Sequence, residues 1–317
     1  MRRATTATAT AIAVMTLAAC SRGVPVEPTT GTGSTTETVT SDPGTSTPGT
    51  SGTTSTGSGS SAPTTPTPAS TANVPDNLRV GISFDTPGVG LQTDAGQVGL
   101  DGDVARYVAG RIGSSRVTFV NAAPDQRETL LATDQVDMVI AAYSMTPQRS
   151  RKVTFAGPYL TTGQDLLVSR RSAIRSPEQL RGHTVCSVSG SASTDALVDD
   201  YPGLHLVERA TVSQCVDALT KGEVKAVTSD AAVLAGFARV SRSPDRLALA
   251  GRPFTTERWG VAVPRGDVAM CREVTSALRA MIRSGEWKQA VRANLPPTNR
   301  IAQQTYVAPK QASCGPD

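Results

Sequence analysis

Arg149 stands where a helix would normally carry negative charge. It lies in the stretch AAYSMTPQRSRKV, in which Thr146 has the character of a helix N-cap and Pro147 that of a first helical residue. Arg149 then falls in the first turn, where the helix already presents partial positive charge. Two positive features at one place predict a bound anion. The simpler alternative is that Arg149 belongs to a solvated basic run with Arg151 and Lys152.

Arg127 has a similar position in the preceding predicted helix. Asp125 and Glu128 have the spacing of a capping box, which also puts Arg127 in a first helical turn. Arg127 is therefore a second cation at a helix N-terminus. The alternative is a surface arginine on an amphipathic helix.

Other candidate binding groups lie where predicted strands end. The segment SGSAS precedes a predicted helix, so backbone N–H groups near Ser191 and Ala192 can face an anion, which is compatible with a plain N-cap serine there. Asp230 closes a predicted strand, and its alternative role is to cap the helix that begins at Ala231. Asp85 begins a glycine-rich loop that would close over a ligand.

The elements that must position these residues alternate between strands and helices. The first series has predicted strands at 78–84, 117–122 and 136–142, helices at 103–113 and 125–135, and a glycine-rich loop at 85–102. The rhythm restarts with strands at 184–189, 205–210 and 224–230 and helices at 176–182, 194–201, 212–222 and 231–240. This pattern predicts βαβ units with mostly parallel sheets in two lobes. The tail, 259–295, has a strand and two helices without a sheet of their own, so we expect it to return to the first lobe. A cleft between the lobes is the expected ligand site.

The N-terminus has the features of an export signal. Two arginines and a mildly apolar stretch precede Leu17-Ala18-Ala19-Cys20, which resembles a bacterial lipobox and predicts a signal peptide at 1–19 with lipidation of Cys20. The alternative is an ordinary secretory signal with a chance cysteine. Residues 20–74 are dominated by Ser, Thr, Gly and Pro, which predicts a disordered linker.

The remaining cysteines fit an oxidising compartment. Cys186, Cys215, Cys271 and Cys314 allow three pairings, and we favour Cys186 with Cys215 and Cys271 with Cys314, because each pair lies within one local unit. The alternative is free buried cysteines. The formal net charge is only +4, without a basic patch interleaved with aromatics, so a nucleic-acid partner is not indicated. No zinc-ligand spacing is present, and we predict neither metal nor cofactor.

The order of motifs resembles the family 3 extracellular solute-binding proteins, across nearly all of residues 76–300. The resemblance is carried by GISFDTPGVGL, GLDGDVARYVA, TVCSVSGSAS, VKAVTSDAAVLAGFA and, most specifically, MTPQRSRKVTFAGPY. It extends to the actinobacterial glutamate/glutamine-binding lipoproteins. It implies an α/β, two-lobed periplasmic-binding-protein fold of type II, with lobe 1 at 75–165 plus 258–317, lobe 2 at 166–257, and a ligand cleft between lobes joined by two hinge segments.

The same resemblance implies roles for the candidate residues. Arg149 would pair with the α-carboxylate of an amino acid, the backbone at Ala142 and the hydroxyl of Ser144 would add hydrogen bonds, and Asp230 would accept the ammonium group. Relatives that bind glutamate or aspartate carry an arginine at the place of Arg127, which favours a ligand with a second carboxylate.

The function implied is an amino-acid-binding lipoprotein, tethered outside the cell membrane, that delivers glutamate or aspartate to the permease of an ABC importer. Glutamine and asparagine are alternative ligands, and we expect a monomer. One alternative function is a sensor that signals to a membrane receptor. Another is a lyase or dehydratase on the same fold, but no Ser-His-Asp or Cys-His set is apparent, so we do not expect an enzyme.

Overall fold

The structure is a computed structural model that describes residues 72–241, 246–295, 306–312 and 314. The predicted signal peptide, Cys20 and the linker up to residue 71 lie outside these residues and stay predictions. Among the helices of the described ranges, none combines the length and the apolarity that a membrane span requires.

The first sheet of the described chain has five strands in the order β5-β1-β6-β13-β7. Their bounds are β1 Asn77–Ile82, β5 Arg116–Asn121, β6 Met138–Val139, β7 Thr154–Thr162 and β13 Glu257–Val263. Alternating apolar residues place β1 inside this sheet, because Leu78, Val80 and Ile82 are fully buried.

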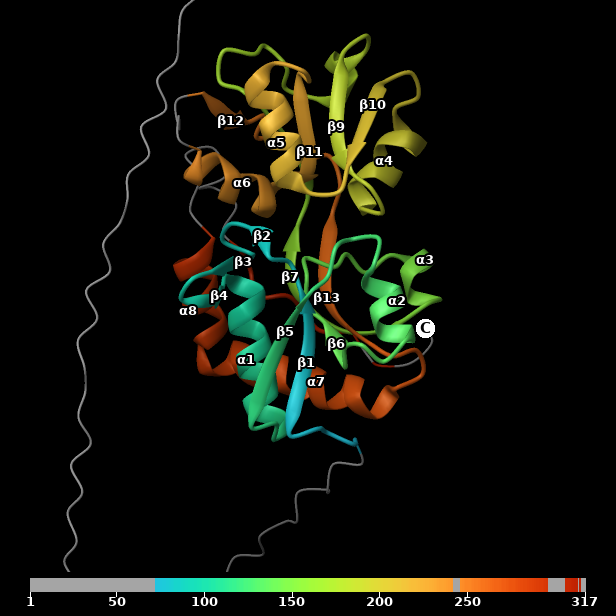
Figure 1. Ribbon diagram of the computed structural model, residues 1–317, viewed down its shortest axis with the longest axis vertical. Coiled ribbons are helices and arrows are strands. Elements are labelled where there is room, and N and C mark those ends of the chain that lie inside the picture. The colour runs from blue at the N-terminus through green and yellow to red at the C-terminus, as the bar shows by residue number, and fades with distance from the viewer. Residues whose placement is uncertain (1–71, 242–245, 296–305, 313, 315–317) are drawn as a thin grey trace, which may run out of the picture. The chain divides into compact units, whose positions relative to one another are not determined.

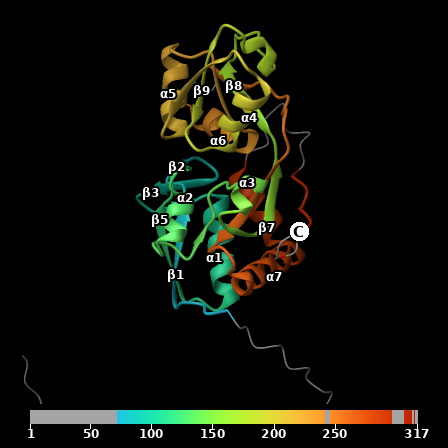
Figure 2. The same ribbon diagram turned by 90° about the vertical axis from the view of Figure 1, so that its right-hand side faces the viewer.

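Helices from both ends of the folded chain accompany this sheet. They are α1 Leu100–Ile112, α2 Arg127–Ala132, α3 Pro147–Ser150, α7 Val268–Ser284 and α8 Glu286–Asn294. The ends of α1 follow from its sequence: two aspartates occupy the first turn, and Gly113 ends the helix in a left-handed conformation. Helix α7 packs on α1 and β7 (Figure 2), and β13 belongs to this sheet, so the predicted return of the tail is confirmed.

The second sheet has the order β10-β9-β11-β8-β12. Its strands are β8 Gln164–Ser169, β9 Thr184–Val188, β10 His205–Arg209, β11 Ala226–Asp230 and β12 Leu247–Leu249. Its helices are the 3₁₀ turn η1 Pro177–Leu180 and the α-helices α4 Ala192–Asp200, α5 Val212–Lys221 and α6 Ala231–Val240. Helix α6 is apolar almost all round and is correspondingly buried from Ala231 to Phe237.

Both sheets are mixed, so the expectation of mostly parallel sheets is wrong. Strand β1 runs parallel to β5 and β6, and β9 runs parallel to β10 and β11. In contrast, β13 is antiparallel to β6 and β7, and β8 is antiparallel to β11 and β12. Strands β8 and β13 each enter their sheet directly from the other half of the fold, after Gly163 and after residues 250–256, and not through a βαβ crossover within the sheet.

The stretch predicted as a glycine-rich loop is also different from expectation. It forms a small antiparallel sheet of β2 Asp85–Thr86, β3 Gly90–Thr93 and β4 Gly96–Val98 before α1 begins. The strands are short and mostly polar, and Gly96, which begins β4 directly after the turn, has a φ of 106°. Short strands of this composition carry little of the apolar alternation from which strands are predicted.

The two sheets lie in separate halves of the folded unit, and the chain passes between them twice, at Gly163 and through residues 250–256 (Figure 1). These crossings run close together, because a Cβ on Gly163 would lie 2.4 Å from the carbonyl oxygen of Thr255. The carboxylate of Asp165, just after the first crossing, accepts a hydrogen bond from the N–H of Gly251 at 3.0 Å. The fold is therefore two-lobed, with paired connections.

Two disulfides cross-link the folded chain. Cys186 on β9 is bonded to Cys215 on α5, and Cys271 on α7 is bonded to Cys314. The favoured pairing is thus confirmed. The first bridge joins two fully buried cysteines of the core, whereas the second attaches the partly buried Cys314 near the C-terminus to the fully buried Cys271 of α7.

Candidate functional site

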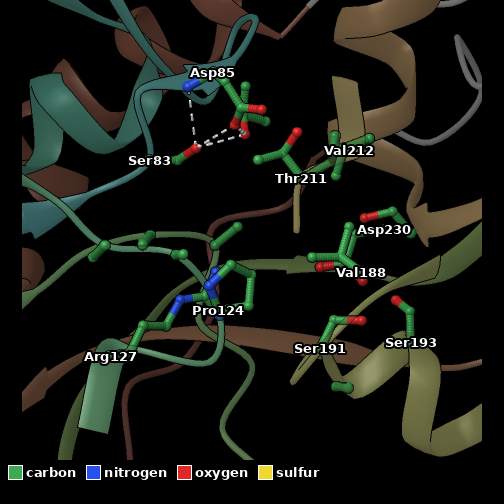
Figure 3. A pocket seen from close by; sticks show the side chains of 18 of the residues that line it. Ser83, Asp85, Pro124, Arg127, Val188, Ser191, Ser193, Thr211, Val212 and Asp230 are labelled. Carbon is green, nitrogen blue, oxygen red and sulfur yellow. Dashed lines mark hydrogen bonds between the residues drawn. The ribbon is translucent and has the colours of Figure 1, made fainter. Parts of the chain in front are cut away.

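A cavity of about 150 Å³ is lined by residues from both lobes. Arg127 and Asp230 enter it from opposite sides (Figure 3). The structure brings together every residue that was predicted to bind a ligand, namely Asp85, Arg127, Ala142, Ser144, Arg149, Ser191, Ala192 and Asp230. These residues are separated by up to 145 positions in the sequence, so the fold alone assembles the set.

Arg149 is held at the cavity by the short helix α3. As predicted, Thr146 is the N-cap and its hydroxyl accepts a hydrogen bond from the N–H of Arg149 at 3.3 Å. The guanidinium donates to the carbonyl of Ser144 at 3.1 Å and, across to the other half, to the carbonyl of Gly190 at 3.0 Å. Arg149 is only 6% exposed. The alternative of a solvated basic residue is therefore wrong.

Arg127 is the first residue of α2 and is only 7% exposed, so it is not a surface arginine. The predicted capping box is wrong, however. The N-cap is Gln126, whose backbone is already helical and whose side chain makes no cap bond. Its N–H donates to the carbonyl of Ala123, so the chain turns before the helix starts and Asp125 falls outside the cap position.

The two arginines share one aromatic neighbour. The guanidinium carbons of Arg127 and Arg149 lie 5.0 and 4.9 Å from the ring centroid of Tyr143. Burial, with a further contribution from the charge of Arg149, lowers the pKa of Arg127 to about 10. In the described part of the chain, neither arginine forms an ion pair with a carboxylate within 4 Å. Two buried like charges with no carboxylate in direct contact favour an anionic guest.

Asp230 supplies negative charge on the other side of the cavity. It immediately precedes α6, but its side chain makes no cap bond, so its side chain does not serve as the alternative N-cap. Its Oδ2 instead accepts a hydrogen bond of 2.5 Å from the indole Nε1 of Trp259, a fully buried residue on β13 of the first sheet. Burial raises the pKa of Asp230 to about 7, and the nearby Glu257 adds to this effect.

Asp101 is a site residue to which the sequence analysis assigned no role. Its buried carboxylate accepts hydrogen bonds from the hydroxyl of Tyr159 at 2.7 Å and from the N–H of Ala142 at 2.9 Å. Ala142 has a φ of 47°, in the left-handed region that alanine rarely adopts, so Asp101 fixes an unusual backbone at the cavity wall. Burial raises the pKa of Asp101 to about 7. An aspartate in a helix first turn is common, which is why its sequence signal was weak.

Ser191 and Asp85 have partners within the protein. The hydroxyl of Ser191 caps α4 by accepting from the N–H of Thr194, and the Ser191 N–H donates to the carbonyl of Val188. The Asp85 carboxylate accepts from the hydroxyl of Ser213, on α5 in the other half, at 2.7 Å. Figure 3 also shows its contact with Ser83. Asp85 therefore connects the two halves at the cavity rim.

Comparisons with known proteins agree with this geometry. Residues 78–295 match the family of bacterial extracellular solute-binding proteins, family 3. The chain is 36% identical over 240 residues to the glutamate-binding protein GluB of Corynebacterium efficiens, covering 72% of this chain and 82% of the relative. It is 30% identical over 219 residues to the ABC transporter glutamine-binding protein GlnH of Bacillus subtilis, covering 68% of this chain and 79% of that relative. The solved structure of an ancestral arginine-binding protein bound to arginine matches with a TM-score of 0.66 at 27% identity, covering 71% of this chain and 100% of that one. The chain therefore belongs to the family 3 bacterial extracellular solute-binding proteins.

Proposed function

We propose that this protein binds an acidic amino acid, glutamate or aspartate, in the cavity between its lobes and delivers it to the permease of an ABC importer. The observation that carries the proposal is the pair of buried arginines that lack a carboxylate partner among the described residues. A ligand with two carboxylates supplies the two negative charges that this pair needs.

The opposing charges give the ligand one orientation. The guanidinium of Arg149 pairs with the α-carboxylate, since two of its N–H groups are used by protein carbonyls and others remain for a ligand. Asp230, across the cavity, accepts the ammonium group. Arg127 then pairs with the side-chain carboxylate. Ala142 contributes its backbone carbonyl, because its N–H is bonded to the carboxylate of Asp101, and Ser144 contributes its hydroxyl.

The start of α4 is the remaining anion-binding element. Ala192 lies at the first helical position and lines the cavity, so its N–H supports a carboxylate there. The N–H of Ser191 is engaged with Val188, which leaves this residue its hydroxyl as the contributing group.

Delivery to a membrane permease requires that the protein stay outside and near the membrane. We propose that Cys20 carries a lipid anchor after removal of residues 1–19, and that the segment to residue 74 tethers a folded part made of lobe 1 (75–165 and 258–317) and lobe 2 (166–257). The proposal is supported by the lipobox-like sequence and by the matched relative that is named an ABC transporter binding protein.

Isothermal titration of the purified protein with glutamate, aspartate, glutamine and asparagine tests the ligand. We expect the two acids to bind more tightly than the two amides. Arg149→Ala should abolish binding of all four, and Arg127→Met should weaken the acids selectively. Arg111→Met, at an exposed arginine on α1, is the control and should change nothing. Binding of neutral amino acids in preference to the acids would overturn the proposed specificity.

A further inference from the structure

The ring of Tyr143 is the structural element that Arg127 and Arg149 have in common. Both guanidinium carbons lie within 5.0 Å of the ring centroid, and Tyr143 is itself fully buried. We propose that Tyr143 is a positioning residue that holds the two guanidiniums together and thereby determines the preference for a ligand with two carboxylates. This inference rests on the proposed function and deepens it.

Two desolvated cations at one place need compensation from the protein itself. They repel each other, and neither has a carboxylate within 4 Å among the residues described. The face of an aromatic ring carries partial negative charge and attracts cations most strongly where water is excluded. Tyr143 supplies this attraction to both arginines without neutralising them, so their full charge stays available to a ligand.

The ring is fixed well enough to act as a support. Phe155 packs against it edge to face, with ring centroids 5.0 Å apart. The backbone is held as well, because the carbonyl of Tyr143 accepts a hydrogen bond from the N–H of Gly260 at 2.9 Å. Tyr143 does not line the cavity, and its ring is connected to the ligand site through the two guanidiniums that it contacts.

The two arginines depend on the ring to different extents. Arg149 is also anchored by the carbonyls of Ser144 and Gly190. Arg127 has a buried Nε without a hydrogen-bond partner, so the ring is a larger share of its support. Weakening the ring should therefore displace Arg127 more than Arg149. The side-chain carboxylate of the ligand would lose more than the α-carboxylate, and discrimination between glutamate and glutamine would fall.

A fluorination series at position 143 tests the ring's charge without changing its shape. Tyr143→Phe provides the baseline, and phenylalanines with increasing ring fluorination at the same position progressively remove the negative face. Titration with glutamate and with glutamine gives the ratio of their dissociation constants. We expect Tyr143→Phe to keep the preference for glutamate. The most fluorinated ring should reduce that preference by about tenfold, while glutamine affinity changes by less than about threefold.

Phe119 offers a matched control, because its ring contacts Arg106 at 5.4 Å outside the cavity. The same fluorinated residues at position 119 should leave both affinities unchanged. A preference for glutamate that stays constant along the series at position 143 would overturn the role of Tyr143. Failure of the parent protein to prefer glutamate would overturn the proposed function instead, so the two failures are distinguishable. If a fluorinated protein does not fold, Tyr143→Leu removes the ring altogether and must reduce the same ratio.

Discussion

Replacing Arg127 by methionine should stabilise the protein while weakening its binding of acidic ligands. The pKa of Arg127 is lowered from its ordinary 12.5 to about 10, chiefly by burial. Both values lie above neutral pH, so the side chain is charged in the folded and unfolded states and its full desolvation cost applies at pH 7. The difference corresponds to about 3 kcal/mol against folding.

Replacing the arginine removes this desolvation cost, but part of the resulting stabilisation is offset by lost interactions. The contact with the ring of Tyr143 is lost, which costs about 1–2 kcal/mol in a desolvated site. Methionine retains most of the buried aliphatic volume, so a further packing loss should be small. A net stabilisation of about 1–2 kcal/mol remains, equivalent to a rise in Tm of roughly 2–8 °C for a folded unit of this size.

Differential scanning fluorimetry at pH 7 with and without glutamate gives two readings from one experiment. Without ligand, Arg127→Met should melt above the parent. With glutamate at about 1,000 times the parent's Kd, the parent gains about 4 kcal/mol and the order should reverse. A variant that melts below the parent without ligand would refute the idea that this arginine is an unpaired, costly cation.

Three further predictions concern the charge of Asp230, the disulfide between Cys271 and Cys314, and the contact between the lobes at Gly236. Because burial raises the pKa of Asp230 to about 7, and only its ionised form accepts an ammonium group, affinity measured by titration should fall by up to about tenfold per pH unit below 7, and Asp230→Asn should flatten this profile. Replacing Cys271 and Cys314 by serine removes a disulfide that closes a loop of 43 residues. The free energy of unfolding, measured in urea, should fall by about 4 kcal/mol, and ligand preference should not change. Gly236→Ala would put a Cβ 1.9 Å from the carbonyl oxygen of Pro87 in the other lobe, so ligand affinity should fall at least about tenfold by titration.

Each of these predictions has a control variant or an outcome that would contradict it. Gly110→Ala, in α1 with nothing within 4 Å of the added Cβ, should leave affinity unchanged and isolate the lobe contact from the general effect of alanine in a helix. A pH profile that survives in Asp230→Asn would assign the titration to another group, such as Asp101. Equal urea midpoints for the serine variant and the oxidised parent would contradict the role of the C-terminal disulfide.

The sequence predicted the cavity residues better than the contacts between them. Arg149 was recognisable because Thr146 and Pro147 mark a helix start and make its charge anomalous. Tyr143 and Trp259, by contrast, are aromatic residues within apolar runs, where the ordinary interpretation is core packing. Their links to Arg127 and to Asp230 join distant segments, and nothing local in the sequence signals such a pairing.

The helices of the fold were predicted better than the strands and their directions. Helices α5 and α7 have clear apolar faces, and their end glycines adopt the left-handed conformation expected of helix caps. Strand β8 was not predicted, and the antiparallel direction of β13 could not be recognised, because both strands are almost entirely buried and lack the apolar–polar alternation that is common in antiparallel strands. Orientation depends on where the chain crosses between lobes, a property of the assembled molecule.

The hydrogen bond between Trp259 and Asp230 makes Trp259 an intrinsic fluorescence probe of the contact between the two lobes. The chain has two tryptophans, and Trp259 on the first sheet is tied to a carboxylate of the second. Trp287, on α8, donates to the backbone of Tyr159 and is not part of the cavity. Indole emission should therefore change whenever the two halves shift relative to each other. In Trp287→Phe, indole emission would come only from Trp259, beside Asp230, the proposed partner of the ammonium group. Binding of an amino acid could then be followed in real time without an attached dye.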